Sequence, residues 1–433
     1  MRHFLHCVIF ALSFIGHAGA QPKTDSLLRQ ILVRGISDRF KPILQRPDSF
    51  RLQIIYTQIY RDKNNTPSFR NYYYNVDPLL YYNPASTVKL PLALLALEKI
   101  NRLSRKDVAR DSYMQFDSSH VGQVAALYDS TSSPPYFPSI SHYIRKAFLV
   151  SDNDAYNRLY QFVGQGCINE WLTARGYRHS RIIRQFMGFN EEQNRHTNQV
   201  RFIDKSGKTV YTQPAAYNDK PITFDRTIKV GTGHLDRNGK LVNEPIDFSR
   251  ANDVALEDLQ RMLQAVMFPE SLPASQRFLL TKDDLAFLRR FLSQYPSETN
   301  YPKYDSAQYF DSYVKFFFKQ GSHQMPRNVR VFNKVGWAYG FLTDVSYVVD
   351  FDNRIEYFLT ATIYVNSDGI VNDDQYDYEQ TGWPFLFEVG QAIYRYDLSR
   401  ERKHKPDLSN FKIRYETRDP NDQRIPLRNI DND

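Results

Sequence analysis

Cysteine is almost absent from the chain: 433 residues contain only Cys7 and Cys167. Two thiols exclude a scaffold built on disulfides and a zinc or iron–sulfur site made from cysteines. The ten histidines form no His-Glu-x-x-His pair, so no metal or other cofactor is expected. The net charge is +8, but the basic residues are scattered among acidic ones. That pattern does not favour binding to nucleic acid.

Long apolar runs are missing once the first twenty residues are passed. Arg2 precedes the thirteen-residue apolar run 4–16, and this segment ends in Ala18-Gly19-Ala20. Such an arrangement is typical of a secretory signal peptide cleaved after Ala20. A helix of thirteen residues rises only about 20 Å, which is too short for a bilayer core of about 30 Å. We therefore expect an exported protein, periplasmic or secreted, that is a monomer without a membrane anchor.

Aromatic residues, by contrast, are abundant, with 30 Tyr and 30 Phe, so a large apolar core is expected. Apolar alternation predicts strands at residues 51–60, 72–74, 329–332, 343–351 and 355–366. Helical spacing predicts helices within residues 21–50, 84–103, 139–150, 154–162, 254–267, 282–293 and 384–394. Strands near both ends with helices between them predict an α+β fold. In this fold one antiparallel sheet is built from both chain ends, and an all-helical lobe is inserted between them.

The predicted helices and strands also indicate the domain boundaries. Residues 21–49 form an N-terminal helical segment, and residues 50–398 form the main domain. A turn-rich insertion is expected at about 189–248, where Ser206-Gly207 and Asn238-Gly239 each predict a hairpin. The last segment, 399–433, mixes both signs of charge and is expected to be a flexible tail.

Ser86 and Lys89 stand at the start of the strongest predicted helix. Asn83 is a good N-cap and Pro84 suits the first helical position, so Ser86 is expected in the first turn. Residues i and i+3 share a helix face, so the amine of Lys89 can reach the hydroxyl of Ser86. Because a serine hydroxyl is a weak nucleophile unless a base takes its proton, this spacing suggests an activated serine.

Two further motifs follow. Ser151-Asp152-Asn153 comes after the helix predicted at 139–150, and Asn333-Lys334-Val335-Gly336-Trp337 comes after the strand predicted at 329–332. Alone, the first could be an ordinary helix cap and the second an ordinary strand end with a glycine bulge. Together and in this order, Ser-x-x-Lys, Ser-Asp-Asn and Lys-x-Gly resemble the motif set of class A β-lactamases and penicillin-binding proteins.

This resemblance implies a β-lactamase/transpeptidase-like fold over about residues 50–398 and a serine hydrolase acting through an acyl-enzyme. Its small-molecule substrate would be a β-lactam or a peptidoglycan-like amide or ester. The roles that it implies are a nucleophile (Ser86), a proton acceptor (Lys89), a proton relay (Ser151) and substrate-binding residues (Asn153, Lys334, Gly336, Trp337). The backbone N–H groups of Ser86 and Trp337 would form the oxyanion hole.

The chain departs from the family pattern in two places. Val335 stands where the family usually has a hydroxyl that helps to hold the substrate carboxylate. Class A enzymes also use a glutamate to activate the deacylating water, but neither Glu191 nor Glu192 matches the family's Glu-x-x-x-Asn spacing. A peptidoglycan D,D-peptidase, an esterase and a penicillin-binding sensor without turnover therefore remain alternatives. Elsewhere, His142 is expected to lie at the surface.

Overall fold

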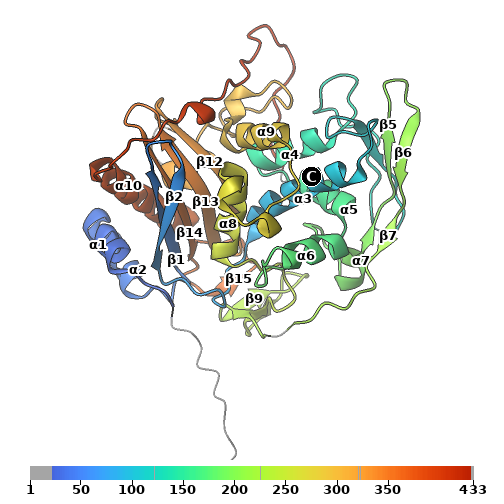
Figure 1. The fold of residues 1–433 in the computed structure, drawn as a ribbon. Coiled ribbons are helices and arrows are strands. Elements are labelled where there is room, and N and C mark those ends of the chain that lie inside the picture. The colour runs from blue at the N-terminus through green and yellow to red at the C-terminus, as the bar shows by residue number, and fades with distance from the viewer. Residues whose placement is uncertain (1–21, 121, 225, 320, 322, 431–433) are drawn as a thin grey trace, which may run out of the picture.

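The protein is described by a computed structural model that covers residues 22–120, 122–224, 226–319, 321 and 323–430. The predicted signal peptide, 1–20, lies outside these residues. A five-stranded antiparallel sheet forms the centre, in the order β12-β13-β14-β1-β2. Its strands are β1 (Gln53–Arg61), β2 (Pro67–Tyr74), β12 (Val329–Ala338), β13 (Phe341–Asp350) and β14 (Ile355–Tyr364). The sheet is thus built from both ends of the chain, as predicted (Figure 1).

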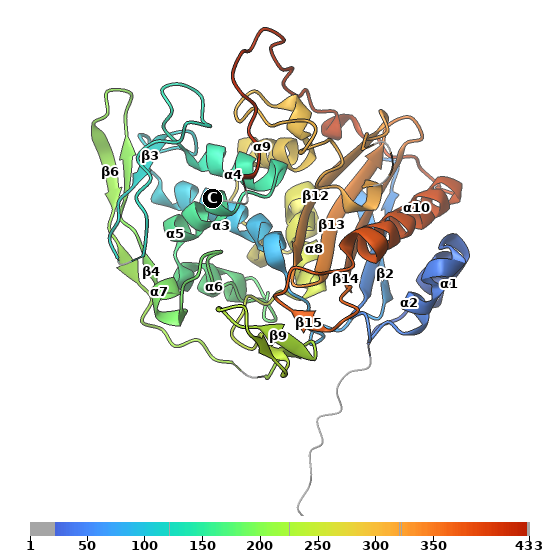
Figure 2. The ribbon, with the colours of Figure 1, turned by 180° about the vertical axis from the view of Figure 1, so that it is seen from behind.

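The two faces of the sheet are covered by different helices. One face packs against the terminal helices, as Figure 2 shows from behind. These helices are α1 (Ser26–Gly35), α2 (Lys41–Gln45) and α10 (Trp383–Ser399). The other face packs against α8 (Leu256–Met267) and, beyond it, the helical lobe. The structure therefore confirms the α+β fold with an inserted helical lobe.

The helical lobe surrounds one buried helix. Its helices are α3 (Lys89–Leu103), α4 (Ile140–Leu149), α5 (Asn153–Val163), α6 (Gln165–Ala174), α7 (Glu191–Arg195) and α9 (Lys282–Ser293). Nearly every residue of α3 up to Ile100 is buried, because its apolar residues point in all directions rather than to one side. Helix α6 was not predicted. Gly164 ends α5 at a φ of +89°, and α6 begins at the next residue.

The insertion does not form one unit. Its first half joins the helical lobe, where β5 (Val200–Ile203) pairs with β3 (Tyr113–Phe116) and β6 (Thr209–Gln213). Its second half forms a small sheet with β15, a strand that follows β14. The strands of that sheet are β9 (Gly233–Leu235), β10 (Leu241–Val242) and β15 (Ile370–Val371). The remaining short strands are β4 (His196–Thr197), β7 (Ala216–Tyr217), β8 (Lys229–Val230) and β11 (Ile246–Asp247). Both predicted hairpins, β5–β6 and β9–β10, are present.

The charged C-terminal segment crosses from α10 to the helical lobe (Figure 1). Arg418 donates hydrogen bonds to the carbonyls of Thr299 and Pro296. Leu427 forms a parallel bridge with Tyr304, and both pack in a small apolar cluster that includes Val150. Residues up to 430 therefore contact the body of the protein. Among the described residues, no helix has the length and apolar character needed to span a bilayer.

Candidate active site

Ser86 lies in a 3₁₀ turn, η2 (Ala85–Val88), that leads directly into α3. The side chain of Asn83 accepts the N–H of Ala85 at 2.9 Å, so it holds this turn rather than the first turn of α3. Ala85 has a φ of +43°, a left-handed conformation that costs energy for a residue with a Cβ. The nucleophile predicted in the first helical turn thus sits just before it.

Lys89 is fully buried and forms the centre of the site. Its Nζ donates to Oγ of Ser86 at 2.8 Å and to Oδ1 of Asn153 at 2.8 Å. It lies 3.3 Å from Oγ of Ser151 and also donates to the carbonyl of that residue. One amine thus connects the first motif to Ser151 and Asn153 of the second.

Ser151 joins the two lysines. Its Oγ accepts a hydrogen bond from Nζ of Lys334 at 2.9 Å, and Lys334 is 1% exposed. Ser151 has a φ of +68°, a strained conformation that is typical of functional loops. Two buried amines therefore converge on one hydroxyl beside Ser86, a geometry in which a proton can pass between Ser86, Lys89 and Ser151.

Gly336 places β12 against the turn that holds Ser86. A Cβ at this position would lie 2.5 Å from the carbonyl oxygen of Pro84 and 2.9 Å from the backbone nitrogen of Ser86. Only glycine permits so close an approach. The strand predicted to end at Phe332 continues to Ala338, so Lys334, Gly336 and Trp337 all lie on it. Trp337 lines the same cavity as Ser86.

Val335 faces away from the cavity. It is fully buried in the apolar cluster between the sheet and α10, together with Phe316 and Leu342. The role that the family pattern gives to a hydroxyl at position 335 is therefore not open to a side chain here. A hydroxyl here would enter an apolar core, because successive side chains of a strand point to opposite faces.

The site opens into a cavity of about 910 Å³. Ser86, Ser151, Asn153 and Trp337 line it, and the remaining wall comes from the turn before α3, the loop after α6, the insertion and the residues that follow it, the end of β12 and the segment after β14. These additional residues are Asn83, Ala85, Arg184, Gln185, Phe186, Met187, Gly188, Ile246, Asp247, Phe248, Ala251, Asn252, Ala338, Tyr339, Asn372, Asp374, Tyr376 and Tyr378. Among the described residues of this wall there is no glutamate.

The two glutamates considered for deacylation point elsewhere. Glu191 pairs with Arg250 at 2.7 Å, and Glu192 pairs with His196 at 3.4 Å. Both lie on α7, are about half exposed and do not line the cavity. Instead, Phe186 lies beside Lys89, with its ring centroid 5.3 Å from Nζ. Neither glutamate is therefore placed to activate a water at Ser86.

A buried ionic chain supports the second motif from behind. Asp152 caps α5 by accepting the N–H of Ala155 at 2.7 Å, and it lies 3.3 Å from Nζ of Lys146. Lys146 also lies 3.2 Å from Asp129, which in turn contacts His142 at 3.0 Å. His142 is buried, so its predicted surface position is wrong. Neither periodicity nor a motif marks Asp129 in the sequence, because that residue lies in a loop.

The pKa values in this chain follow from burial and pairing. Burial opposes the charge of Asp129, but the hydrogen bond with His142 and the charge of Lys146 hold its pKa well below the usual range. Burial likewise opposes the charge of Lys146, but Asp152 and Asp129 raise its pKa. Burial lowers the pKa of His142 in spite of Asp129. The Ser151 loop is thus anchored by a charged pair and a neutral imidazole.

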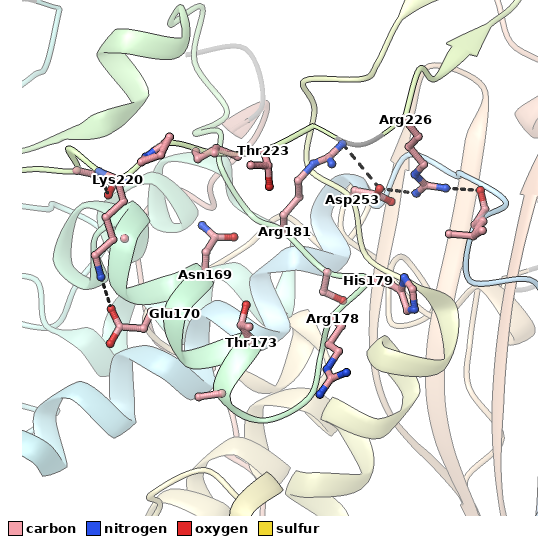
Figure 3. A pocket seen from close by; sticks show the side chains of 17 residues that line it. Asn169, Glu170, Thr173, Arg178, His179, Arg181, Lys220, Thr223, Arg226 and Asp253 are labelled. Carbon is pink, nitrogen blue, oxygen red and sulfur yellow. Dashed lines mark hydrogen bonds and ion pairs between the residues drawn. The ribbon is translucent and has the colours of Figure 1, made fainter. Parts of the chain in front are cut away.

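A second cavity, of about 590 Å³, lies beside α6 (Figure 3). It contains none of the predicted site residues. Several of its charged side chains pair with one another: Arg181 and Arg226 with Asp253, and Lys220 with Glu170. In the part of the chain that the structure describes, no group of His, Cys, Asp and Glu side chains could hold a metal ion.

Comparison with known proteins agrees with the motifs. Residues 53–217 match Beta-lactamase2, the beta-lactamase enzyme family. The predicted family resemblance is confirmed. The matched segment contains the first two motifs, whereas Lys334 lies beyond it. No curated protein matches the chain.

Similar solved structures include two beta-lactamases and a protein named PBP-A. The beta-lactamase from Sphaerobacter thermophilus DSM 20745 is 11% identical over 84% of this chain and 98% of its own, with a TM-score of 0.45. The beta-lactamase from Desulfarculus baarsii DSM 2075 is 14% identical over 86% and 99%, with a TM-score of 0.46. PBP-A is 12% identical over 87% and 98%, with a TM-score of 0.46.

Proposed function

We propose that the protein is a serine hydrolase that β-lactams, or related amides and esters, acylate at Ser86. The observation that carries this proposal is the position of the Lys89 amine, 2.8 Å from the Ser86 hydroxyl and fully buried. A neutral amine at this position can accept the serine proton as the hydroxyl attacks a carbonyl. Ser151, held by Lys334, then carries a proton to the leaving group.

Labelling with a fluorescent penicillin tests the proposal. Wild-type protein should take up one label per chain, and Ser86→Ala should take up none. Ser118→Ala is a matched control, because Ser118 is a serine outside the cavity. If neither a fluorescent penicillin nor a fluorophosphonate labels the wild type, or if Ser86→Ala labels equally well, Ser86 is not the nucleophile.

The second candidate is a penicillin-binding sensor or D,D-peptidase whose acyl-enzyme with a β-lactam is long-lived. The observation that favours it is Phe186, whose ring covers Lys89 where a water-activating carboxylate would be useful. Hydrolysis of an acyl-enzyme needs a base within reach of a water near the ester. A mass increase of one intact penicillin that persists for hours would favour this candidate over a β-lactamase with rapid turnover.

The site of action is proposed to be outside the cytoplasm, because residues 2–20 have the composition of a signal peptide. Expression of the full chain in a bacterium with a periplasm, followed by N-terminal sequencing, tests this. The mature protein should begin at Gln21. A cytoplasmic protein that retains Met1 would contradict export without affecting the proposed chemistry.

A further inference from the structure

One wall of the Ser86 cavity is aromatic. Trp337 and Tyr339 come from β12 and the turn after it, Phe248 comes from the insertion, and Tyr376 and Tyr378 come from the segment after β15. Neighbouring rings contact one another: Phe248 lies 5.3 Å from Tyr339, and Tyr376 lies 5.3 Å from Tyr378, between centroids. This side of the cavity is therefore bordered by aromatic residues from three separate parts of the chain, four of which form two ring pairs.

Two tyrosines of this wall are fixed by the backbone. The hydroxyl of Tyr376 accepts the N–H of Asn372, and that of Tyr378 accepts the N–H of Gly340, each at 2.8 Å. Burial raises the pKa of both phenols, so the rings remain neutral at physiological pH. The faces of neutral tyrosine and tryptophan rings attract cations.

Two residues that line the cavity near this wall carry negative charge. Asp247 and Asp374 both line the cavity and are exposed. Hydrogen bonds with Ser249 lower the pKa of Asp247, so that carboxylate is ionised. Residues 367–382 contain five acidic residues and no lysine or arginine. This is a local property, since the whole chain carries a net charge of +8.

Arg184 is the one basic residue among the described residues that line the cavity; Lys229 and Arg250 lie near Asp247 but do not line it. The guanidinium of Arg184 donates to the carbonyl of Phe189 at 2.9 Å. Lys89 and Lys334 are buried at the reacting centre around Ser86 and Ser151. A substrate therefore meets positive charge where its acyl bond reacts and negative charge where its outer part contacts the aromatic wall.

We propose that the site prefers acyl donors that carry a positively charged amine on the part held against this wall. The inference rests on the proposed acylation of Ser86 and names the substrate class for it. An ammonium group gains from the aromatic faces and from both carboxylates, whereas a carboxylate at the same place is repelled by Asp247 and Asp374.

Two penicillins that differ in one charged group provide the test. Aminobenzylpenicillin carries an ammonium on its side chain, and carboxybenzylpenicillin carries a carboxylate on the same carbon. We expect the second-order rate of Ser86 acylation to be about tenfold higher for the amine. The ratio should fall towards one in Asp247→Asn/Asp374→Asn, and it should also fall as salt is raised, because these carboxylates are exposed.

Asp219→Asn is the matched control, because Asp219 is exposed but does not line the cavity; it should leave the ratio unchanged. Equal rates for the two penicillins, a faster carboxylate, or an undiminished ratio in the double variant would overturn the inference while leaving the acylation of Ser86 intact. If neither penicillin reacts, 4-nitrophenyl esters of lysine and of glutamate give the same comparison. Failure of both pairs to acylate Ser86 would overturn the proposed function and this inference together.

Discussion

The ring of Phe186 covers the amine of Lys89, with 5.3 Å between the ring centroid and Nζ. The ring is held in place by stacking on Tyr156, at 4.2 Å between centroids. Its backbone N–H also donates to the side chain of Asn157 at 2.8 Å. An apolar ring fixed in this way cannot activate water. The proposed acylation of Ser86 therefore predicts that residue 186 influences the lifetime of the acyl-enzyme.

Phe186→Glu should accelerate deacylation. With nitrocefin, the wild type is expected to give a burst of about one equivalent and then a slow steady state. A carboxylate at position 186 can act as a general base, and such a base contributes about a hundredfold or more, so the steady-state rate should rise at least about tenfold. Stopped-flow absorbance measures both phases.

Phe186→Gln is the control for this change, because it removes the ring without supplying a base. It should leave the steady state slow. Linear wild-type turnover at tens per second without a burst would contradict the prediction. Glu191→Gln and Glu192→Gln would then show whether either glutamate reaches the site in solution.

Lys89 should act as a base rather than only as a cation. Lys89→Ala is expected to lower the acylation rate at least about a hundredfold, the lower end for loss of a general base. Lys89→Arg should be equally inactive, because a guanidinium keeps its proton. Retention of activity by the arginine variant would assign Lys89 an electrostatic role. A loss below about threefold in both variants would remove it from the mechanism.

Much of the fold could be predicted, because it depends on local patterns. The strand-forming residues of β1, β13 and β14 and the all-round apolar character of α3 fit elements that are buried on nearly all sides. Helix α6 was missed because Gly164 ends one helix and directly precedes another. The insertion was read as one piece because sequence does not tell which of its strands pair with β3 and which with β15.

The sequence predicted the site residues that belong to the three motifs. The structure brings Ser86, Lys89, Ser151, Asn153 and Lys334 into contact. Contacts between residues that are far apart in the chain leave no motif in the sequence. The position of Phe186 beside Lys89 depends on the path of a loop, and the pairing of Asp129 with Lys146 joins a loop to a helix. The face of the sheet on which the Val335 side chain lies could be known only once the position of β12 in the sheet was known.

Gly336→Ala should separate the strand from the nucleophile. The added Cβ would lie 2.5 Å from the carbonyl oxygen of Pro84, so either β12 or the Ser86 turn must move. A misplacement of about 1 Å can cost a hundredfold in rate, and we expect acylation to fall by at least about tenfold. Gly188→Ala is a matched control, because Gly188 also lines the cavity but has no atom within 4 Å of its added Cβ. Equal rates in the two variants would contradict this role of Gly336.

Val335→Thr should weaken the fold rather than improve substrate binding. The new hydroxyl would enter the apolar cluster beside Phe316 and Leu342. Burial of an unpaired hydroxyl costs about 1–3 kcal/mol, which urea unfolding should detect. Penicillin acylation should change less than about threefold, because one hydrogen bond to a charged group would alter it tenfold or more. A clear gain in acylation would show that residue 335 reaches the substrate.

Asp129→Asn should destabilise the protein at neutral pH and progressively less in acid. The hydrogen bond with His142 and the charge of Lys146 outweigh burial and depress the pKa of Asp129, so the native state binds fewer protons than the unfolded state. The stability that this carboxylate contributes is therefore present above its unfolded pKa of about 3.9 and is lost as pH falls below it. Loss of one partner of a buried pair costs about 3 kcal/mol. Urea unfolding at pH 7, 5 and 3 should show that the difference in unfolding free energy between wild type and variant narrows only at the lowest pH.

Two further variants show whether this buried chain also positions Ser151. Lys146→Met removes the amine that joins Asp129 to Asp152, so it should slow acylation as well as lower stability. Asp129→Asn leaves the Lys146–Asp152 pair intact and should retain most of the acylation rate. Asp107→Asn removes an exposed partner of Arg105 and should leave unfolding nearly unchanged, because exposed ion pairs contribute little. If the difference in unfolding free energy between wild type and Asp129→Asn stays constant from pH 7 to 3, the carboxylate of Asp129 is not the group that titrates. If Lys146→Met is acylated at the normal rate, the buried ionic chain supports the fold without positioning Ser151.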